Sequence, residues 1–330
     1  MATLLLDRAE LEIRADGDAL ALYEQGSRSG TVPLKLLERV VIQGARTRLD
    51  SGVLLKLAEA GAGTLLLSPR ASRRVAIVLG PAHNDAAVRL AQGRRVTDDA
   101  FCAEWARQLV SAKVRRQHRL LVAAGQRRPD QRKAIFDACT TLERIAAQIA
   151  PAAGVGETST ATLRGLEGSA ARAYFQGYAA LFPPALKFSG RNRRPPRDPV
   201  NACLSLAYTL LHFDAVRAAH IAGLDPLLGF YHRPAFGRES LASDLIEPLR
   251  PLADEWVWNM FAARTLREEH FAADKGACLL GKAGRGRFYA DWERFAAMPR
   301  RWLRRRCARL AAGLRAEGKA WLVADEEEMF

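Results

Sequence analysis

The chain has 330 residues, of which 49% are hydrophobic and 8% aromatic, and this apolar content excludes intrinsic disorder as its main state. It carries 50 Lys and Arg against 36 Asp and Glu, for a net charge of +14. This excess of bases favours a polyanion such as nucleic acid as the partner. A GC-rich genome would explain the preference for Arg over Lys, but not the excess of bases over acids.

Length, hydropathy and cysteine spacing narrow the class of protein further. The length corresponds to about two domains. No apolar run approaches the roughly 20 residues that span a bilayer, and the N-terminus lacks the basic region of a signal peptide. The five cysteines are far apart and odd in number, which argues against a disulfide framework or a zinc site. We therefore expect a cytoplasmic protein with reduced thiols and no membrane association.

Short apolar runs between turn residues predict a small, mainly β domain over residues 1–82. Turns are expected at 15–18 and 26–30, and a single helix over 52–60. The expected strands are 11–14, 19–23, 39–42, 63–67 and 74–78.

The periodicity changes to that of helices after residues 83–96, which we expect to be a linker. Apolar residues recur every four positions from Phe101 to Leu109, and those of 135–149 alternate steps of three and four. Both patterns predict amphipathic helices. We therefore predict an α+β fold in which a larger, all-α helical catalytic domain, residues 97–330, follows the β domain.

Signals at helix ends predict two further helices. Asp198 as N-cap and Pro199 at the first helical position begin one helix, and Gly223 follows its end. Ser240 is expected to cap the next helix, which should bend near Pro248.

The segment 164–175 places a carboxylate among small residues. If the segment is helical, Glu167 lies beside Tyr174, and Gly165 and Gly168 remove bulk from around it. Each glycine costs a helix about 1 kcal/mol relative to Ala, which is tolerable where a metal, a phosphate or another helix approaches closely. A glycine-lined helix crossing, with Glu167 paired to an Arg, is the simpler alternative.

Two other segments offer a histidine and a pair of acids. His232 follows two aromatic residues, where a lone histidine is usually structural. Asp244 and Glu247 share one helix face, where two carboxylates repel each other unless a cation or a shared proton intervenes. With Glu167, these residues would give one nitrogen and two or three oxygen ligands, a set that suits Mg²⁺ or Mn²⁺. A hard cation in a basic chain indicates phosphodiester chemistry.

Two basic segments are expected to contact the phosphate backbone of DNA without reading its sequence. One is a loop with glycine and proline over 187–197, and the other is a helix over 300–306. A solvated basic face is the alternative for each. The candidate DNA-binding residues are Lys187, Arg191, Arg193, Arg194 and Arg197 in the loop and Arg301, Arg304 and Arg305 in the helix.

The order of these motifs resembles the CRISPR-associated spacer-acquisition integrase family, the larger of the two core CRISPR adaptation proteins. The resemblance covers essentially the whole chain. The matching stretches are 166–175, 198–211, His232 and 240–251, with weaker matches at Arg89 and Gln92 and at Lys113, Gln117 and Leu120.

The resemblance implies a set of site residues. The metal ligands would be Glu167, His232 and Glu247, while Asp244 corresponds to a second acidic position that is either a ligand or a neighbour. Arg238 loosely matches a base that contacts phosphate. The residues expected to line the cleft are Asn201, Ser205 and Tyr208.

The resemblance also implies an activity and an assembly. Members of the family are Mg²⁺- or Mn²⁺-dependent DNA endonucleases and integrases of the prokaryotic cytoplasm. They insert short DNA duplexes, the spacers, into a CRISPR array by attack of a 3′-hydroxyl on a phosphodiester at the repeat ends. They form homodimers, with residues 1–82 expected as the dimerisation domain, and bind a small ferredoxin-like partner in a heterohexamer. The alternatives are a structure-selective, metal-dependent nuclease of branched DNA and a basic scaffold that binds DNA without chemistry.

Overall fold

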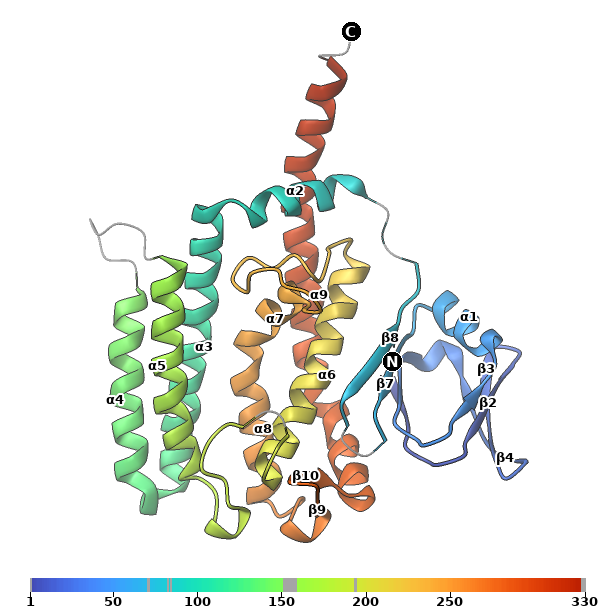
Figure 1. Cartoon of the computed structure of the whole chain (residues 1–330), viewed down its shortest axis with the longest axis horizontal. Helices are drawn as coiled ribbons and strands as arrows, with labels where there is room; N and C mark the ends of the chain where they lie inside the picture. The colour runs from blue at the N-terminus through green and yellow to red at the C-terminus, as the bar shows by residue number, and fades with distance from the viewer. Residues whose placement is uncertain are drawn as a thin grey trace. The chain divides into compact units, whose positions relative to one another are not determined.

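The chain divides into two compact units in the computed structural model (Figure 1). The β unit comprises Met1–His83 and Gly281–Ala297, and the helical unit comprises Asn84–Leu280 and Met298–Phe330. The predicted α+β fold, with a strand-rich N-terminal region before a largely helical one, is confirmed. The structure describes residues 2–69, 72–81, 83, 85–150, 159–192 and 195–327.

Two four-stranded sheets dominate the β unit. The first has the strand order β1-β5-β7-β8 and is parallel except between β7 and β8. The second has the order β4-β3-β2-β6 and is antiparallel except between β2 and β6. The strands are β1 Ala2–Leu6, β2 Glu12–Asp16, β3 Ala19–Glu24, β4 Ser27–Pro33, β5 Leu37–Ile42, β6 Arg48–Leu49, β7 Gly63–Leu67 and β8 Arg74–Val78.

Apolar side chains from both sheets and from helix α1, Ser51–Glu59, form the core of the β unit. Ile13, Leu20, Val40 and Leu57 each expose 2% or less of their surface. Burying one such side chain contributes about 1.5–3 kcal/mol to folding. These residues fall in the apolar runs from which the β domain is predicted.

Strand β4 occupies residues 27–30 of the turn predicted at 26–30. The turn expected at 26–30 is wrong because β4 begins at Ser27, and the two turn residues are Gln25 and Gly26, with φ angles of 50° and 81°. Positive φ at both positions is typical of a tight two-residue hairpin. The side chains of β4 are mostly exposed or half-buried, so its sequence lacks the apolar alternation that identifies a strand.

Helices α2 to α8 and the second part of α9 build the helical unit. Their apolar faces are buried, as in α4, where Leu142 and Ile149 have no exposed surface. None of the helices described is long and apolar enough to cross a membrane. The α-helices are α2 Ala86–Val96, α3 Asp99–Arg127, α4 Arg132–Ile149, α5 Thr160–Ala179, α6 Pro199–Ile221, α7 Ser240–Ile246, α8 Arg250–Ala262 and α9 Lys282–Glu327. The 3₁₀ helices of the chain are η1 Leu34–Leu36, η2 Pro129–Gln131, η3 Pro184–Leu186, η4 Glu247–Leu249 and η5 Glu268–His270.

The predicted linker, residues 83–96, contains helix α2. The side chain of Asp85 accepts the backbone N–H of Ala87 and caps this helix at 3.1 Å. Gln92 is fully buried, and its amide donates to the backbone carbonyls of Asp225 and Leu228. The segment is therefore a packed part of the helical unit, which its polar, Arg-rich sequence does not reveal.

The region 97–330, predicted to be all-α, contains a β-hairpin, and its residues 281–297 belong to the β unit. Strands β9, Phe271–Asp274, and β10, Ala277–Leu280, form an antiparallel hairpin whose four-residue strands are too short to show an alternating pattern. The following residues, Gly281–Ala297, belong to the β unit, where the Tyr289 hydroxyl donates to the side chain of Gln43. The chain therefore passes from one unit to the other three times, after residues 83, 280 and 297.

Helix α6 begins and ends as its sequence predicts, whereas α7 does not. The side chain of Asp198 accepts a backbone N–H of the first turn at 2.8 Å, and Gly223, with a φ of 82°, follows the end of α6. Ser240 was expected to cap α7, but the N-cap is Glu239, without a side-chain cap. The Ser240 hydroxyl instead donates to the carbonyl of Arg233, which ties down the preceding loop.

Candidate metal centre

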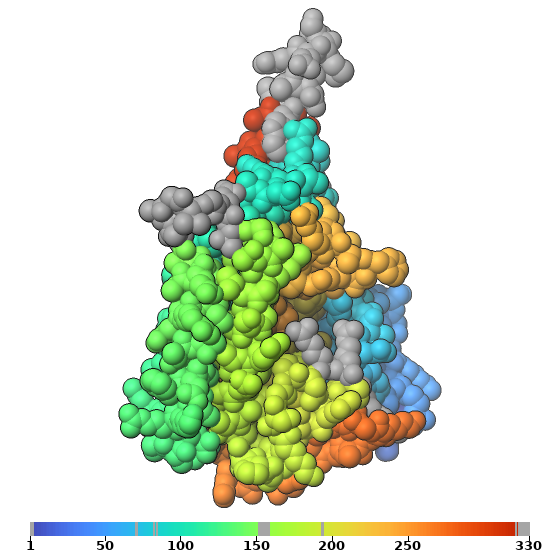
Figure 2. Space-filling model, turned by 60° about the vertical axis from the view of Figure 1, so that its left-hand side comes forward, coloured from blue at the N-terminus to red at the C-terminus, as the bar shows by residue number. Residues whose placement is uncertain are grey.

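Four elements of the helical unit bring together the acids that the sequence singles out. Helix α5 carries Glu167 and helix α3 carries Lys113, while His232 lies in the loop before α7. Asp244 lies on α7, and Glu247 begins the 3₁₀ turn η4 that follows it. Figure 2 shows α5 (yellow-green) and the loop between α6 and α7 (gold) on one face of this unit.

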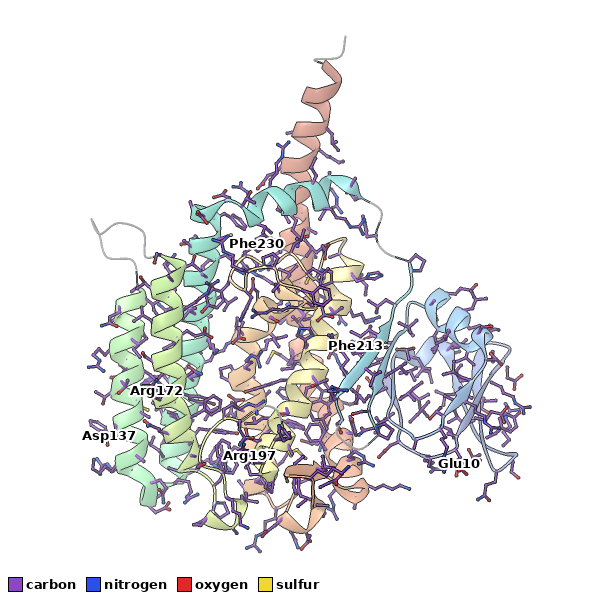
Figure 3. The ribbon with its side chains drawn as sticks, viewed as in Figure 1. Glu10, Asp137, Arg172, Arg197, Phe213 and Phe230 are labelled. Atoms are coloured by element: carbon purple, nitrogen blue, oxygen red, sulfur yellow. The ribbon has the colours of Figure 1, made fainter. Side chains whose placement is uncertain are left out.

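Aromatic packing fixes the loop that carries His232. The ring of Phe230, labelled in Figure 3, contacts the rings of Phe101 and Trp105 edge-on, at centroid distances of 5.0 and 5.1 Å. A side chain at Gly229 would meet the backbone of Ser240 at 2.6 Å, so only glycine lets the loop pass this close to α7. Phe101 and Trp105, which the sequence predicts to share one face of a helix, thus hold the loop that precedes Asp244 and Glu247 in the chain.

Lys113 joins the two glutamates. Its Nζ donates to Glu167 Oε1 at 2.5 Å and to Glu247 Oε2 at 2.6 Å, and the residue is 8% exposed. Burial alone would lower the pKa of Lys113, but the carboxylates of Glu247 and Glu167 outweigh burial and raise it above its ordinary value. Lys113 is therefore an ammonium ion on which two of the predicted metal ligands converge.

In each glutamate, the carboxylate oxygen that does not contact Lys113, here called the outer oxygen, accepts a hydrogen bond from a second donor. The hydroxyl of Tyr231 donates to Glu167 Oε2 at 2.5 Å, and Arg250 Nε donates to Glu247 Oε1 at 2.8 Å. Burial raises the pKa of Tyr231, so its phenol keeps its proton. Burial would also raise the pKa of Glu247, but Arg250 and Lys113 hold it well below its ordinary value. Each carboxylate thus has one anchored oxygen and one oxygen on Lys113.

Asp244 orients His232. It is fully buried and accepts the backbone N–H groups of Phe230, Tyr231 and His232 at 2.8 to 2.9 Å, and it lies 2.7 Å from His232 Nδ1. A carboxylate offers about four acceptor sites, and these contacts use all of them. The contacts of Asp244 therefore hold the loop and the Nδ1 side of the His232 ring, and Nε2 is the ring nitrogen that Asp244 does not engage.

The residue types of this donor set suit a divalent cation, but in this structure the ammonium of Lys113 lies where the two carboxylates converge. Within the described part of the chain, no three His, Cys, Asp or Glu side chains are grouped to hold a metal ion. Two carboxylates with anchored outer oxygens and an imidazole held at Nδ1 by a carboxylate are the supports typical of metal ligands. The assignment of Glu167, His232 and Glu247 as ligands stays a prediction.

Helix α5 is exposed at Gly165 and Gly168. Neither Gly165 nor Gly168 has another atom within 4 Å of the position that a Cβ would take. A Cβ at Gly177, in contrast, would meet Ala138 at 2.7 Å. The alternative of a glycine-lined helix crossing is therefore wrong at Gly165 and Gly168 and applies at Gly177, more than two helix turns further on. The partner of Glu167 is a Lys rather than an Arg.

Two of the residues of α6 that are predicted to line the cleft, Asn201 and Ser205, anchor the basic loop. Asn201 is fully buried, and its amide nitrogen donates to the carbonyl of Gly190 at 2.8 Å. Arg191 donates to Asn201 Oδ1 at 2.8 Å and to the hydroxyl of Ser205 at 3.1 Å. The guanidinium of Arg191 is thus engaged by α6 and fixes the loop to this helix.

Tyr208, the third of these residues, belongs to a second buried network. Its hydroxyl donates to Asp254, as does that of Tyr174 at 2.8 Å. Burial raises the pKa of Asp254 to about 6, against the two phenol donors, which lower it. The guanidinium of Arg250 lies 4.5 Å from the ring centroid of Tyr208 and connects this network with Glu247.

The basic helix over 300–306 presents some arginines outward and uses others for packing. Arg300 is buried and pairs with Asp214 at 2.9 Å, and Arg306 lies over the ring of Trp105 at 4.4 Å. Arg193 and Arg194 lie outside the described residues. The candidate DNA-binding side chains that are exposed are Lys187, Arg197 (labelled in Figure 3), Arg238, Arg301, Arg304 and Arg305.

Three residues of the centre were not predicted as site residues. Lys113 interrupts the apolar face of α3 between Val110 and Val114, and a lysine in a buried stripe is the signal that could have found it. Tyr231 and Arg250 flank predicted ligands in sequence, but nothing in the sequence shows that they point inward.

Comparisons with known proteins show which family the sequence of the chain matches. The model of the family "CRISPR associated protein Cas1" matches residues 4–294. The curated "CRISPR-associated endonuclease Cas1 1" of Thermodesulfovibrio yellowstonii is 37% identical over 302 residues, which are 91% of this chain and 93% of that protein.

Solved structures share the fold over nearly the whole chain. A casposase bound to its integration product superposes with a TM-score of 0.81 at 22% identity, covering 96% of this chain and 91% of the casposase. A chain of a Cas6-RT-Cas1–Cas2 complex superposes with a TM-score of 0.80 at 23% identity, covering 96% of this chain and 35% of that one. At these identities the structural likeness supports the fold alone.

Proposed function

The chain belongs to the CRISPR-associated Cas1 family, and we propose that it is a metal-dependent DNA endonuclease and integrase of CRISPR adaptation. Its reaction would insert spacer duplexes into a CRISPR array by attack of a 3′-hydroxyl on a phosphodiester at a repeat end. The observation that carries this proposal is the convergence of Glu167 and Glu247 on one cation, beside a histidine that Asp244 orients.

Glu167, His232 and Glu247 would hold Mg²⁺ or Mn²⁺. When bound, the metal would neutralise charge on the phosphodiester and favour deprotonation of the attacking hydroxyl. The protein's part is to keep the ligand atoms in place before the DNA arrives. Tyr231 and Arg250 do so for the two glutamates.

The exposed bases of the helical unit would bind the DNA backbone. Lys187, Arg197 and Arg238 are exposed, as are three arginines of α9. Contacts of this kind position a duplex without reading its bases, and their affinity falls steeply with salt.

We propose the assembly that the family resemblance implies. The β unit would form the homodimer, and a small ferredoxin-like adaptation protein would join two dimers into a heterohexamer in the prokaryotic cytoplasm. The complex with Cas2 named for one structural neighbour supports this partnership.

A strand-transfer assay tests the proposal. A labelled duplex and a plasmid with a repeat are incubated with the protein and either Mg²⁺ or Mn²⁺. We expect joined strands, and we expect Glu167→Gln to abolish joining while duplex binding stays unchanged. Glu104→Gln is the matched control because Glu104 is exposed on α3 and pairs only locally, with Arg107 and Gln108.

The products separate the competing functions. Nicked ends without joined strands would indicate the nuclease of branched DNA, for which the name of the curated relative, an endonuclease, also speaks. Binding that responds to salt, with no effect of chelator or of Glu167→Gln on any product, would indicate the scaffold and contradict the metal site.

A further inference from the structure

Lys113 is an unusual lysine in this chain. Among the lysines of the chain, all of which are described, it alone is buried. It lies on the packed face of α3, next to Val110 and Val114, and its ammonium donates hydrogen bonds to two glutamates. Lysine is almost never buried unless it is paired. Its position is therefore set by the two carboxylates.

The ammonium and a divalent cation would need the same oxygens. Oε2 of Glu167 and Oε1 of Glu247 are taken by Tyr231 and Arg250, so the oxygens that face each other are the two that Lys113 holds. A cation that bridges the two glutamates must take these inner oxygens. It cannot do so while the ammonium stays at 2.5 and 2.6 Å from them.

We propose that Lys113 is an internal counter-ion that competes with the divalent metal for Glu167 and Glu247 and so sets the metal affinity of the site. The inference rests on the proposed function, because it assumes a metal at these carboxylates. Lysine suits the role since its charge sits at the end of a flexible four-carbon chain, which can withdraw without moving α3. The anchors on the outer oxygens keep both carboxylates in place during the exchange.

Competition makes a prediction that a purely structural lysine does not. Removing the ammonium leaves two carboxylates facing each other without a cation, which destabilises the protein in the absence of metal. The same change removes the competitor, so the metal should bind more tightly. A lysine that merely holds the ligands in place would show the opposite, namely weaker binding after substitution.

The test is a Mn²⁺ titration of the full chain by calorimetry at constant ionic strength. We expect Lys113→Met and Lys113→Gln to bind Mn²⁺ at least about tenfold more tightly than the unmodified protein, a change of about 1.4 kcal/mol. In thermal unfolding, both variants should melt lower in EDTA and gain more from Mn²⁺. Lys133→Met is the matched control, since Lys133 is exposed on α4 and pairs only with Asp137. Its affinity should stay within about twofold.

A measurement on the unmodified protein covers the case in which both variants fail to fold. With ¹⁵N-labelled lysine, the buried ammonium should be the signal that exchanges most slowly with water. We expect Mg²⁺ to shift or broaden this signal and to leave the other lysine signals unchanged. A signal that stays unchanged at saturating Mg²⁺ would overturn the inference.

The outcomes also separate this inference from the proposed function. If the unmodified protein binds Mn²⁺, Glu167→Gln abolishes binding, and the Lys113 variants bind equally or more weakly, then the metal site stands and the counter-ion role is overturned. If neither the unmodified protein nor the Lys113 variants bind Mn²⁺ saturably, both proposals are overturned.

Discussion

Glu247 and Asp254 are both buried carboxylates of the helical unit, exposed by 4% and 1%, but their neighbours differ. Burial would raise the pKa of Glu247, yet Arg250 and Lys113 outweigh burial and lower it. Asp254 accepts hydrogen bonds from two tyrosine phenols, and burial raises its pKa to about 6. Cations keep a carboxylate charged inside a protein, whereas neutral donors only reduce the penalty of burial.

The two environments suit different tasks. The glutamates share an ammonium that another cation can replace, while the side chains that donate hydrogen bonds to Asp254 stay neutral, because burial raises the pKa of Tyr174 and Tyr208 well above the ordinary value. Arg250 touches both environments, through Glu247 and through the ring of Tyr208. The network around Asp254 thus adjoins the cluster of Glu167, Glu247 and Lys113 and supports it through Arg250.

The largest effect on stability should come from removing a charge that two buried cations share. Glu247→Ala removes the carboxylate that pairs with Arg250 and leaves Lys113 with Glu167 alone, and breaking a buried ion pair in this way costs about 3–5 kcal/mol. Urea unfolding in EDTA measures the loss. Glu104→Ala, at an exposed ion pair, should cost less than about 1 kcal/mol. Equal losses in the two variants would show that the cations at Glu247 reach water.

Asp254 should make the protein less stable as the pH rises. Its pKa is about 6 in the folded state against an ordinary value of 3.8, so between these values the folded state binds more protons than the unfolded state. The stability lost across this window is about 3 kcal/mol, complete above pH 6 and absent below pH 3.8.

The variant Asp254→Asn isolates this contribution. It cannot titrate, so its stability, measured by urea unfolding from pH 4 to pH 7, should fall less with rising pH than that of the unmodified protein. The difference between the two profiles should approach about 3 kcal/mol at pH 7. Parallel profiles would mean that Asp254 is ionised throughout, as Glu247 is expected to be.

Local signals in the sequence predicted the parts of this structure that local interactions determine. The apolar steps of 135–149 became α4, and Asp198 caps α6 as expected. Glu167 is singled out because it stands among small residues, and Asp244 and Glu247 because the sequence predicts that they share a helix face. The structure instead places Glu247 in η4, after the end of α7.

Contacts between distant segments were not predictable in the same way. Lys113 meets glutamates that lie 54 and 134 residues away, and the sequence does not encode such pairings locally. Helix α2 buries only the small apolar residues Ala87, Val88 and Ala91, and the buried amide of Gln92 binds backbone carbonyls more than 130 residues away. The separate roles of Asp244 and Glu247 likewise follow from the backbone of the His232 loop, which supplies the donors that occupy Asp244.

A smaller loss should follow when one phenol is removed from Asp254. Tyr174 is fully buried, so Tyr174→Phe withdraws a hydrogen bond from a carboxylate that no water can reach, at a cost of about 1.5–3 kcal/mol near pH 7. The variant should also raise the pKa of Asp254 further, because the phenol lowers it. A measured cost near zero would indicate that Asp254 is protonated at pH 7 and needs no donor.

The smallest effect is expected at Tyr231, which makes the corresponding contact with Glu167. The side chain of Glu167 is 19% exposed, so water can replace the phenol in Tyr231→Phe, and the loss in urea unfolding should be about 1 kcal/mol or less. Tyr174→Phe is the internal reference, since both substitutions delete one hydroxyl. If the two variants lose equal stability, water does not reach Glu167, and the carboxylate would be closed to a metal ion as well. A clear difference would mark Glu167 as the solvent-accessible edge of the cluster, where a cation and a DNA phosphate can enter.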